Sequence, residues 1–264
     1  MKKISAIFAA AAALCMFSSN AFAGDTTELL DKGEVDIAPT IGFANITKHN
    51  TGWESDIALS YGVADFMTIG TSFNVSNAVE FAGTYFSFSF DTLFTPLDTE
   101  HFDIDFDIAF TMMTAGGGLG YNLTPMLEFN YDTDNDMSLF GAYMRLAFPM
   151  YSGGVWVDPD DPDPEDPDPD DDGVRTDFAF EITLGLYYMI MPGHQIILEG
   201  GPIIGNMAKK LGPRSTDGFV SIGYNIMAWD DFEITSEVRI DIPEGGDDVS
   251  AAIMVGAIIY LPMM

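Results

Sequence analysis

The chain has 264 residues, of which 41 are acidic and only 10 are lysine or arginine, giving a formal net charge of −31 at pH 7. Nucleic acid is excluded as a partner, because neutralising phosphates requires clustered basic residues. Since 47% of the residues are hydrophobic, the chain is not a disordered acidic protein either. High acidity beside high hydrophobicity requires the two kinds of side chain to be separated in space.

The first residues have the pattern of an export signal. Lys2 and Lys3 precede the apolar run 4–17, and Ala21-Phe22-Ala23 forms a cleavage motif before Gly24. We predict a signal peptide over 1–23 and a periplasmic N-terminal segment over 24–33. Lipidation at Cys15 is disfavoured, because the bulky Leu14 stands where a small residue is needed. Cys15 is the sole cysteine, so the mature chain has no disulfide and no thiol ligand.

From residue 34 onward, polar and apolar residues alternate in segment after segment. In 101–112 every even position is Phe, Ile or Met, and three aspartates occupy odd positions. A period of two is typical of a β-strand with one apolar and one polar face. We predict twelve strands, at 34–46, 53–63, 67–76, 81–93, 101–113, 119–131, 137–150, 176–191, 194–205, 218–228, 232–242 and 249–261.

The connections alternate between short and long. Short turns are expected at 64–66, 95–100, 132–136, 192–193 and 229–231, and longer ones at 77–80, 152–175, 207–217 and 243–248. This asymmetry, an even strand count and strands of about ten residues or more are typical of bacterial outer-membrane barrels. The predicted fold is all-β, a transmembrane antiparallel barrel over 34–261. The alternative is a water-soluble β-sandwich or barrel, in which Phe86, Phe88 and Phe90 would point into a core.

If the apolar residues of each strand face lipid, the residues that alternate with them face a lumen. Among the lumen-facing residues, acids far outnumber the two arginines. In a hydrated interior this excess negative charge would be solvated by water and would attract cations. A plugged, non-conducting interior is the alternative. The predicted lumen-lining residues are Asp36, Glu54, Asp56, Asp91, Asp103, Asp105, Asp107, Glu128, Arg145, Asp177, Glu181, Glu199, Glu233, Glu237, Arg239 and Asp241.

The loop 152–175 contains a run, 158–172, made solely of ten acids and five prolines. Proline and charge repulsion favour an extended, exposed segment, which we place outside the cell. Asp168, Asp170 and Asp172 followed by Gly173 match the first half of a calcium-binding EF-hand loop, but Ala179 occupies the position of its bidentate glutamate. Weak divalent-cation binding is one interpretation of this run, and a solvated spacer is the other.

No catalytic constellation stands out, and we expect a protein that is not an enzyme. The histidines are His49, His101 and His194, and neither of the last two has a suitable serine beside it. His49 with Asp56 is the one candidate pair, and a lone loop histidine is more often simply solvated. No cofactor is expected.

Two segments resemble a known family. Residues 30–42 (LDKGEVDIAPTIG) are similar to the opening strand of the outer-membrane transporters associated with phenol meta-pathway degradation, and 60–70 (SYGVADFMTIG) to their second hairpin. The resemblance implies passage of small, often hydrophobic or aromatic compounds. The chain departs from the pattern in its Asp-Pro loop and in its C-terminus, which lacks a terminal aromatic residue.

The sequence thus predicts an outer-membrane channel or transporter for small solutes, with a non-conducting structural or surface-interaction barrel as the alternative. The expected partners are outer-membrane lipids, lipopolysaccharide, the barrel-assembly machinery and small-molecule solutes.

Overall fold

The structure, a computed structural model, describes residues 29–46, 51–77, 84–115, 118–133, 140–153, 176–205, 216–229, 231–243 and 249–262. Within them every regular element is a β-strand, and none is a helix that could cross a membrane. The strands are β1 (Glu34–Ile46), β2 (Gly52–Ala64), β3 (Met67–Ser76), β4 (Tyr85–Asp98), β5 (Phe102–Ala115), β6 (Gly118–Asp132), β7 (Phe140–Ala147), β8 (Met150–Gly153), β9 (Thr176–Met191), β10 (His194–Gly205), β11 (Thr216–Trp229), β12 (Phe232–Pro243) and β13 (Ser250–Pro262).

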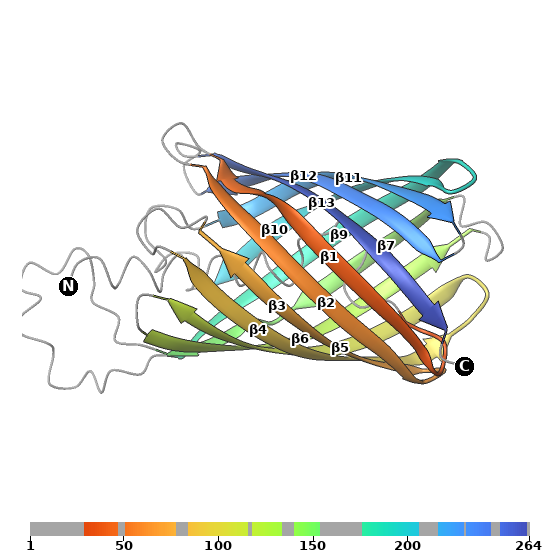
Figure 1. Ribbon diagram of the computed structural model, residues 1–264, viewed down its shortest axis with the longest axis horizontal. Helices are drawn as coiled ribbons and strands as arrows, with labels where there is room; N and C mark the ends of the chain where they lie inside the picture. Colours follow the sequence, from red (N-terminus) through yellow and green to blue (C-terminus); the bar gives the residue numbers. More distant parts are fainter. Residues whose placement is uncertain are drawn as a thin grey trace, which may run out of the picture.

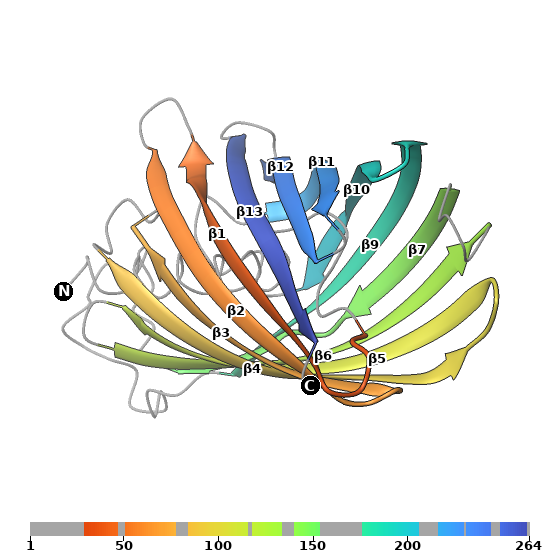
Figure 2. The ribbon, with the colours of Figure 1, turned by 45° about the vertical axis from the view of Figure 1, so that its right-hand side comes forward.

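Each strand pairs antiparallel with the next along the chain, except that β7 and β8 each pair with β6 and β9 and not with each other. The sheet closes on itself through β1 and β13. Val35 lies opposite Leu261 at one end of this seam, and Phe43 lies opposite Ile253 towards the other. The strands run obliquely to the long axis of the barrel (Figure 1). In a second view the wall curves round from β13 and β1 to β9 (Figure 2). The predicted closed antiparallel barrel is confirmed.

The barrel wall has twelve strand positions, because β7 and β8 are two parts of one interrupted strand. Both segments pair with β6 on one side and with β9 on the other. The interruption falls at Phe148 and Pro149, since proline has no N–H to give to the ladder. Its carbonyl still accepts from Ala179 N at 3.0 Å. The uninterrupted strand predicted over 137–150 is therefore wrong, and β8 extends to Gly153, past the predicted start of the loop at 152.

The predicted bounds of β1, β3, β9 and β10 are confirmed, and β4 differs most. It runs to Asp98, so the turn predicted at 95–100 is shorter than expected. The connections β2–β3, β4–β5, β9–β10 and β11–β12 take two or three residues each. Gly193, with φ of 75°, provides the left-handed residue that the tight β9–β10 hairpin needs.

The outer face of the barrel is apolar and the inner face is polar. Phe86, Phe88 and Phe90 are 45–47% exposed, whereas Ser87 between them is 3% exposed. A water-soluble sandwich or barrel would bury these rings in its core, so that alternative is wrong. In β13 the exposed Ile253 and Val255 face outward and the buried Met254 faces inward. This decides the orientation of a strand whose sequence is apolar at both parities.

Exposed aromatic residues gather at both ends of the barrel. Phe43 and Trp53 are paired at one end of the β1–β2 hairpin. Tyr131, Tyr188 and Trp229 lie at the opposite end, near the closes of β6, β9 and β11. Two aromatic belts separated by an apolar band are typical of barrels that span a membrane.

Candidate functional site: the inward wall of the barrel

The predicted lumen residues whose side chains the structure describes face the inside of the barrel. Asp107 is 5% exposed, whereas Phe106 and Ile108 on either side of it are 39% and 40% exposed. The inward charged side chains within the described residues include Asp36, Glu54, Asp56, Asp91, Asp103, Asp105, Asp107, Glu128, Arg145, Glu181, Glu199, Glu233, Glu237, Arg239 and Asp241.

Five predicted site residues lie wholly or partly beyond the described part of the chain. Asp177 belongs to β9, but its side chain is outside the described residues. Asp168, Asp170 and Asp172 are also outside them, as is His49. The calcium-binding interpretation of the loop and the pairing of His49 with Asp56 therefore stay predictions.

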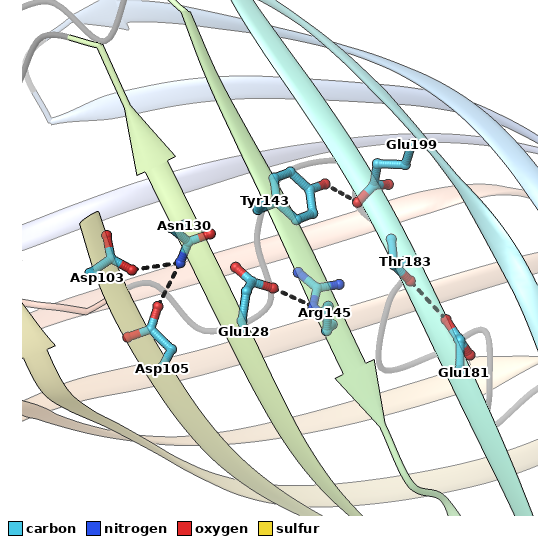
Figure 3. A network of polar contacts seen from close by, with 9 residues as sticks. All are labelled: Asp103, Asp105, Glu128, Asn130, Tyr143, Arg145, Glu181, Thr183 and Glu199. Carbon is cyan, nitrogen blue, oxygen red and sulfur yellow. Dashed lines mark hydrogen bonds and ion pairs between the residues drawn. The ribbon is translucent and has the colours of Figure 1, made fainter. Parts of the chain in front are cut away.

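Arg145 and Glu128 form the central ion pair of the wall (Figure 3). They lie directly opposite each other on β7 and β6, and the guanidinium Nε is 2.5 Å from Glu128 Oε2. Both side chains are largely buried, so the pair is shielded from solvent. Such a pair holds its geometry well, because losing either partner would leave a buried charge uncompensated.

Two tyrosines lie flat on the wall and extend the network to other strands. Tyr143 of β7 lies across Gly185 of β9, and Tyr187 of β9 lies across Gly141 of β7. A Cβ atom at either glycine would overlap the ring above it. Lying over glycine lets Tyr143 OH reach and donate to Glu199 on β10 (Figure 3).

Tyr187 makes the corresponding contact in the other direction. Its hydroxyl donates to Asp132 Oδ2 at the end of β6, over 3.1 Å. The two tyrosines therefore connect β7 and β9 to the strands beyond them on both sides.

Asp103 and Asp105 are held by neutral hydrogen-bond donors. Asn130 Nδ2 on β6 donates to Asp103 Oδ1 at 2.7 Å and to Asp105 Oδ2 at 2.9 Å (Figure 3). Thr95 Oγ1 on β4 donates to Asp105 Oδ1 at 2.5 Å. These bonds fix the positions of the carboxylates without neutralising their charge.

Arg239 is the other inward arginine. Its Nε donates to Asp241 Oδ1 at 2.9 Å, and its guanidinium carbon lies 3.8 Å from the centre of the Phe219 ring. The contact with the ring adds a cation–π attraction to the ion pair. The Arg145 guanidinium lies 5.6 Å from the ring centre of Tyr143, so both arginines contact an acid and an aromatic ring of the wall.

The charges are unevenly distributed round the barrel. Strands β1 to β6 contain no lysine, arginine or histidine, whereas Arg145 and Arg239 lie on β7 and β12. On β1 to β5 the inward acids include Asp36, Glu54, Asp56, Asp91, Asp103, Asp105 and Asp107. One side of the wall is therefore acidic without a base, and the other is partly neutralised.

The sequence pattern identifies the charged residues of the wall but not the neutral ones that position them. The one signal of these neutral residues in the sequence is that they occupy inward-facing positions of their strands, as the acids do; they are Asn130, Thr95, Tyr143 and Tyr187.

Within the described ranges, no three or more histidine, cysteine, aspartate or glutamate side chains are grouped to hold a metal ion. His194 Nδ1 lies 2.7 Å from Tyr224 OH.

No protein-family model matches the chain, and no curated protein matches it. Solved structures do match. An outer membrane channel from Pseudomonas putida F1 has a TM-score of 0.61 at 10% identity, covering 90% of this chain and 98% of that one. The KdgM porin in complex with disordered oligogalacturonate has a TM-score of 0.54 at 11% identity, covering 86% and 98%.

The translocator domain of the autotransporter NalP from Neisseria meningitidis has a TM-score of 0.55 at 8% identity, covering 95% of this chain and 97% of that one. At such identities these likenesses establish the fold alone, a barrel of the outer-membrane type. They do not single out the phenol meta-pathway transporters, so that resemblance stays a prediction.

Proposed function

We propose that this protein is an outer-membrane channel for small solutes whose lumen favours cations. The observation that carries the proposal is the two-faced wall, apolar and exposed outside, acidic inside, with its two inward arginines already engaged by the wall. An aqueous lumen lined by surplus carboxylates raises the local concentration of cations and repels anions.

The uneven charge of the wall gives cationic solutes a preferred path along one side of the lumen. A cationic solute is attracted to the side formed by β1 to β5, where the carboxylates have no basic residue on their own strands. The side that carries Arg145 and Arg239 attracts it less. Solutes with a positive group and a neutral body therefore fit this wall better than anionic ones.

The matched structures support a transport role by their descriptions, since one is an outer membrane channel and another a porin. The saccharide described with the KdgM porin is an oligogalacturonate. Galacturonate units are anionic, and an acidic wall would repel them. The resemblance to the phenol meta-pathway transporters favours small aromatic compounds, and neutral or cationic ones agree with the charge of this wall.

The environment follows from the same two faces. The exposed apolar band would contact outer-membrane lipid, with lipopolysaccharide in the outer leaflet, and insertion would require the barrel-assembly machinery. The predicted signal peptide over 1–23 would direct export.

One observation favours a second function, a structural or surface-interaction barrel that conducts nothing. Several inward apolar side chains are almost fully buried, among them Met113 and Ile197 at 1% exposure each. A barrel filled at that level would hold no continuous water path.

Conductance of the purified protein in a planar lipid bilayer distinguishes the two functions. A channel gives discrete current steps whose size rises with salt concentration. A preparation that has refolded, as shown by a different gel mobility before and after boiling, and still gives no steps would favour the non-conducting barrel.

A further inference from the structure

A row of oxygen-bearing side chains crosses the inward face of β1, β2 and β3. Thr40 lies directly opposite Asp56, and Asp56 lies directly opposite Asn74 on its other side. Directly opposed residues of antiparallel strands have Cβ atoms about 4.5–5.5 Å apart. Glu54 lies two residues before Asp56 on the same face of β2. The four side chains therefore form one compact group.

Three of these side chains carry a buried oxygen atom without a hydrogen-bond partner among the described residues. The atoms are Thr40 Oγ1, Asp56 Oδ1 and Asn74 Oδ1. Thr40 is 7% exposed and Asn74 is 2% exposed. Buried polar atoms are almost always paired, and an unpaired one calls for an explanation such as an ion. Within the described residues, the other buried atoms of this kind do not fall on directly opposed residues.

The orientation of the Asn74 amide follows from its neighbour. Its Nδ2 donates to Glu54 Oε1 at 2.6 Å, as a carboxylate acceptor requires. The amide oxygen on the other branch is therefore directed away from Glu54. Asn74 Oδ1 accepts no hydrogen bond from the described residues, and Asp56, which also carries an unpartnered oxygen, lies directly opposite Asn74.

The group has two carboxylates and no basic residue on the strands that carry it. Glu54 is 3% exposed, and none of β1 to β6 contains a lysine, arginine or histidine. Two neighbouring buried carboxylates need a compensating positive charge. A divalent cation supplies it in full, and carboxylate, amide and hydroxyl oxygens are ligands for calcium, with water completing the coordination. The absence of nitrogen and sulfur donors disfavours zinc.

We propose that Thr40, Glu54, Asp56 and Asn74 form a calcium-binding site in the wall of the barrel. The site is separate from the acidic run at 158–172. It links β1, β2 and β3 through one ion, beside the seam where β1 meets β13. It requires the barrel to fold and does not require it to conduct.

Calcium binding is measured by isothermal titration calorimetry on the full mature chain, refolded in detergent and stripped with a chelator. A background of about 0.3 M KCl screens diffuse attraction by exposed acids and affects a desolvated site much less. We expect one Ca²⁺ per chain. Asp56→Asn should weaken binding about tenfold or more, because an anionic ligand is lost. Thr40→Val, which is nearly isosteric, should weaken it by a smaller factor.

Two control variants should bind as the unaltered protein does. Asp65→Asn removes an exposed acid from the turn between β2 and β3. The joint change of Asp168, Asp170 and Asp172 to Asn removes the loop motif. A shift in gel mobility on boiling checks that each variant is folded. If Asp56→Asn does not fold, Thr40→Val decides the matter. No binding by the unaltered protein, equal binding by the Thr40 variant, or loss of binding in the loop variant would each overturn the proposal.

Discussion

Arg145 joins β7 to the rest of the inward wall. It pairs with Glu128 on β6, and its guanidinium lies 5.6 Å from the ring centre of Tyr143, whose hydroxyl reaches Glu199 on β10. The side chain is 4% exposed. Because Arg145 is so fully buried, its positive charge is stabilised by the surrounding acids rather than by water.

Replacing Arg145 by Gln should destabilise the barrel. The change leaves Glu128 buried without a cation, which typically costs about 3–5 kcal/mol in the free energy of unfolding. Arg145→Lys is the matched control; it keeps the charge and should cost less. The midpoint of urea unfolding of the refolded protein measures both. An unchanged midpoint in the Gln variant would show that the pair does not stabilise the wall.

At the scale of strands, β7 and β9 are registered by two reciprocal tyrosine–glycine pairs. Gly141 lies opposite Tyr187 and Tyr143 lies opposite Gly185. Each ring occupies the space above its glycine, so a slip by one residue would flip every side chain and bring each ring against a different neighbour. The pairs therefore help to specify the register next to the interruption at Pro149.

Gly185→Ala should destabilise the barrel by about 1–3 kcal/mol, because the added methyl group overlaps the Tyr143 ring and forces it to move. Combining it with Tyr143→Ala removes the overlap. The double variant should then be more stable than the sum of the two single changes predicts. Additive effects in urea unfolding would mean that ring and glycine do not interact.

The loop between β8 and β9 should be dispensable for folding. Its acidic run has no apolar surface to bury, so deleting 154–175 and joining the strands by a short Gly-Ser linker should leave the boiling-dependent gel shift intact. Deleting from 150 also removes β8, which pairs with both β6 and β9, and should reduce the folded fraction. Equal folding of the two deletions would contradict the role of β8.

Much of this element structure could be predicted from the sequence, because a period of two marks each strand and its faces directly. The aspartates of β5 are an example, since Phe and Ile between them leave one interpretation. Pro149 lies within a strand predicted from the sequence, and the local alternation carries no sign that the ladder is interrupted there. The tyrosine–glycine pairs and the row Thr40, Asp56, Asn74 depend on which residues of different strands face each other. That register is set by turn lengths and by the whole sheet, which local patterns do not contain.

For the whole molecule, the account requires a closed barrel inserted in the outer membrane. The protein should therefore sediment with outer-membrane fragments, and it should migrate differently on a denaturing gel before and after boiling. The physical reason is that every strand is paired, so detergent alone does not open the sheet. A protein recovered from the soluble periplasm with no such shift would contradict the proposed location.

The measurement that tests the central claim most directly is the reversal potential across a planar bilayer separating two KCl concentrations. The acidic wall predicts a potential of the sign that marks cation selectivity, larger near 0.1 M salt, where the Debye length is about 10 Å, and smaller as salt rises. Changing Asp103, Asp105 and Asp107 together to Asn should reduce it while the barrel still folds, since lumen substitutions tune selectivity. A potential of the opposite sign in the unaltered protein would contradict the proposed cation-favouring channel.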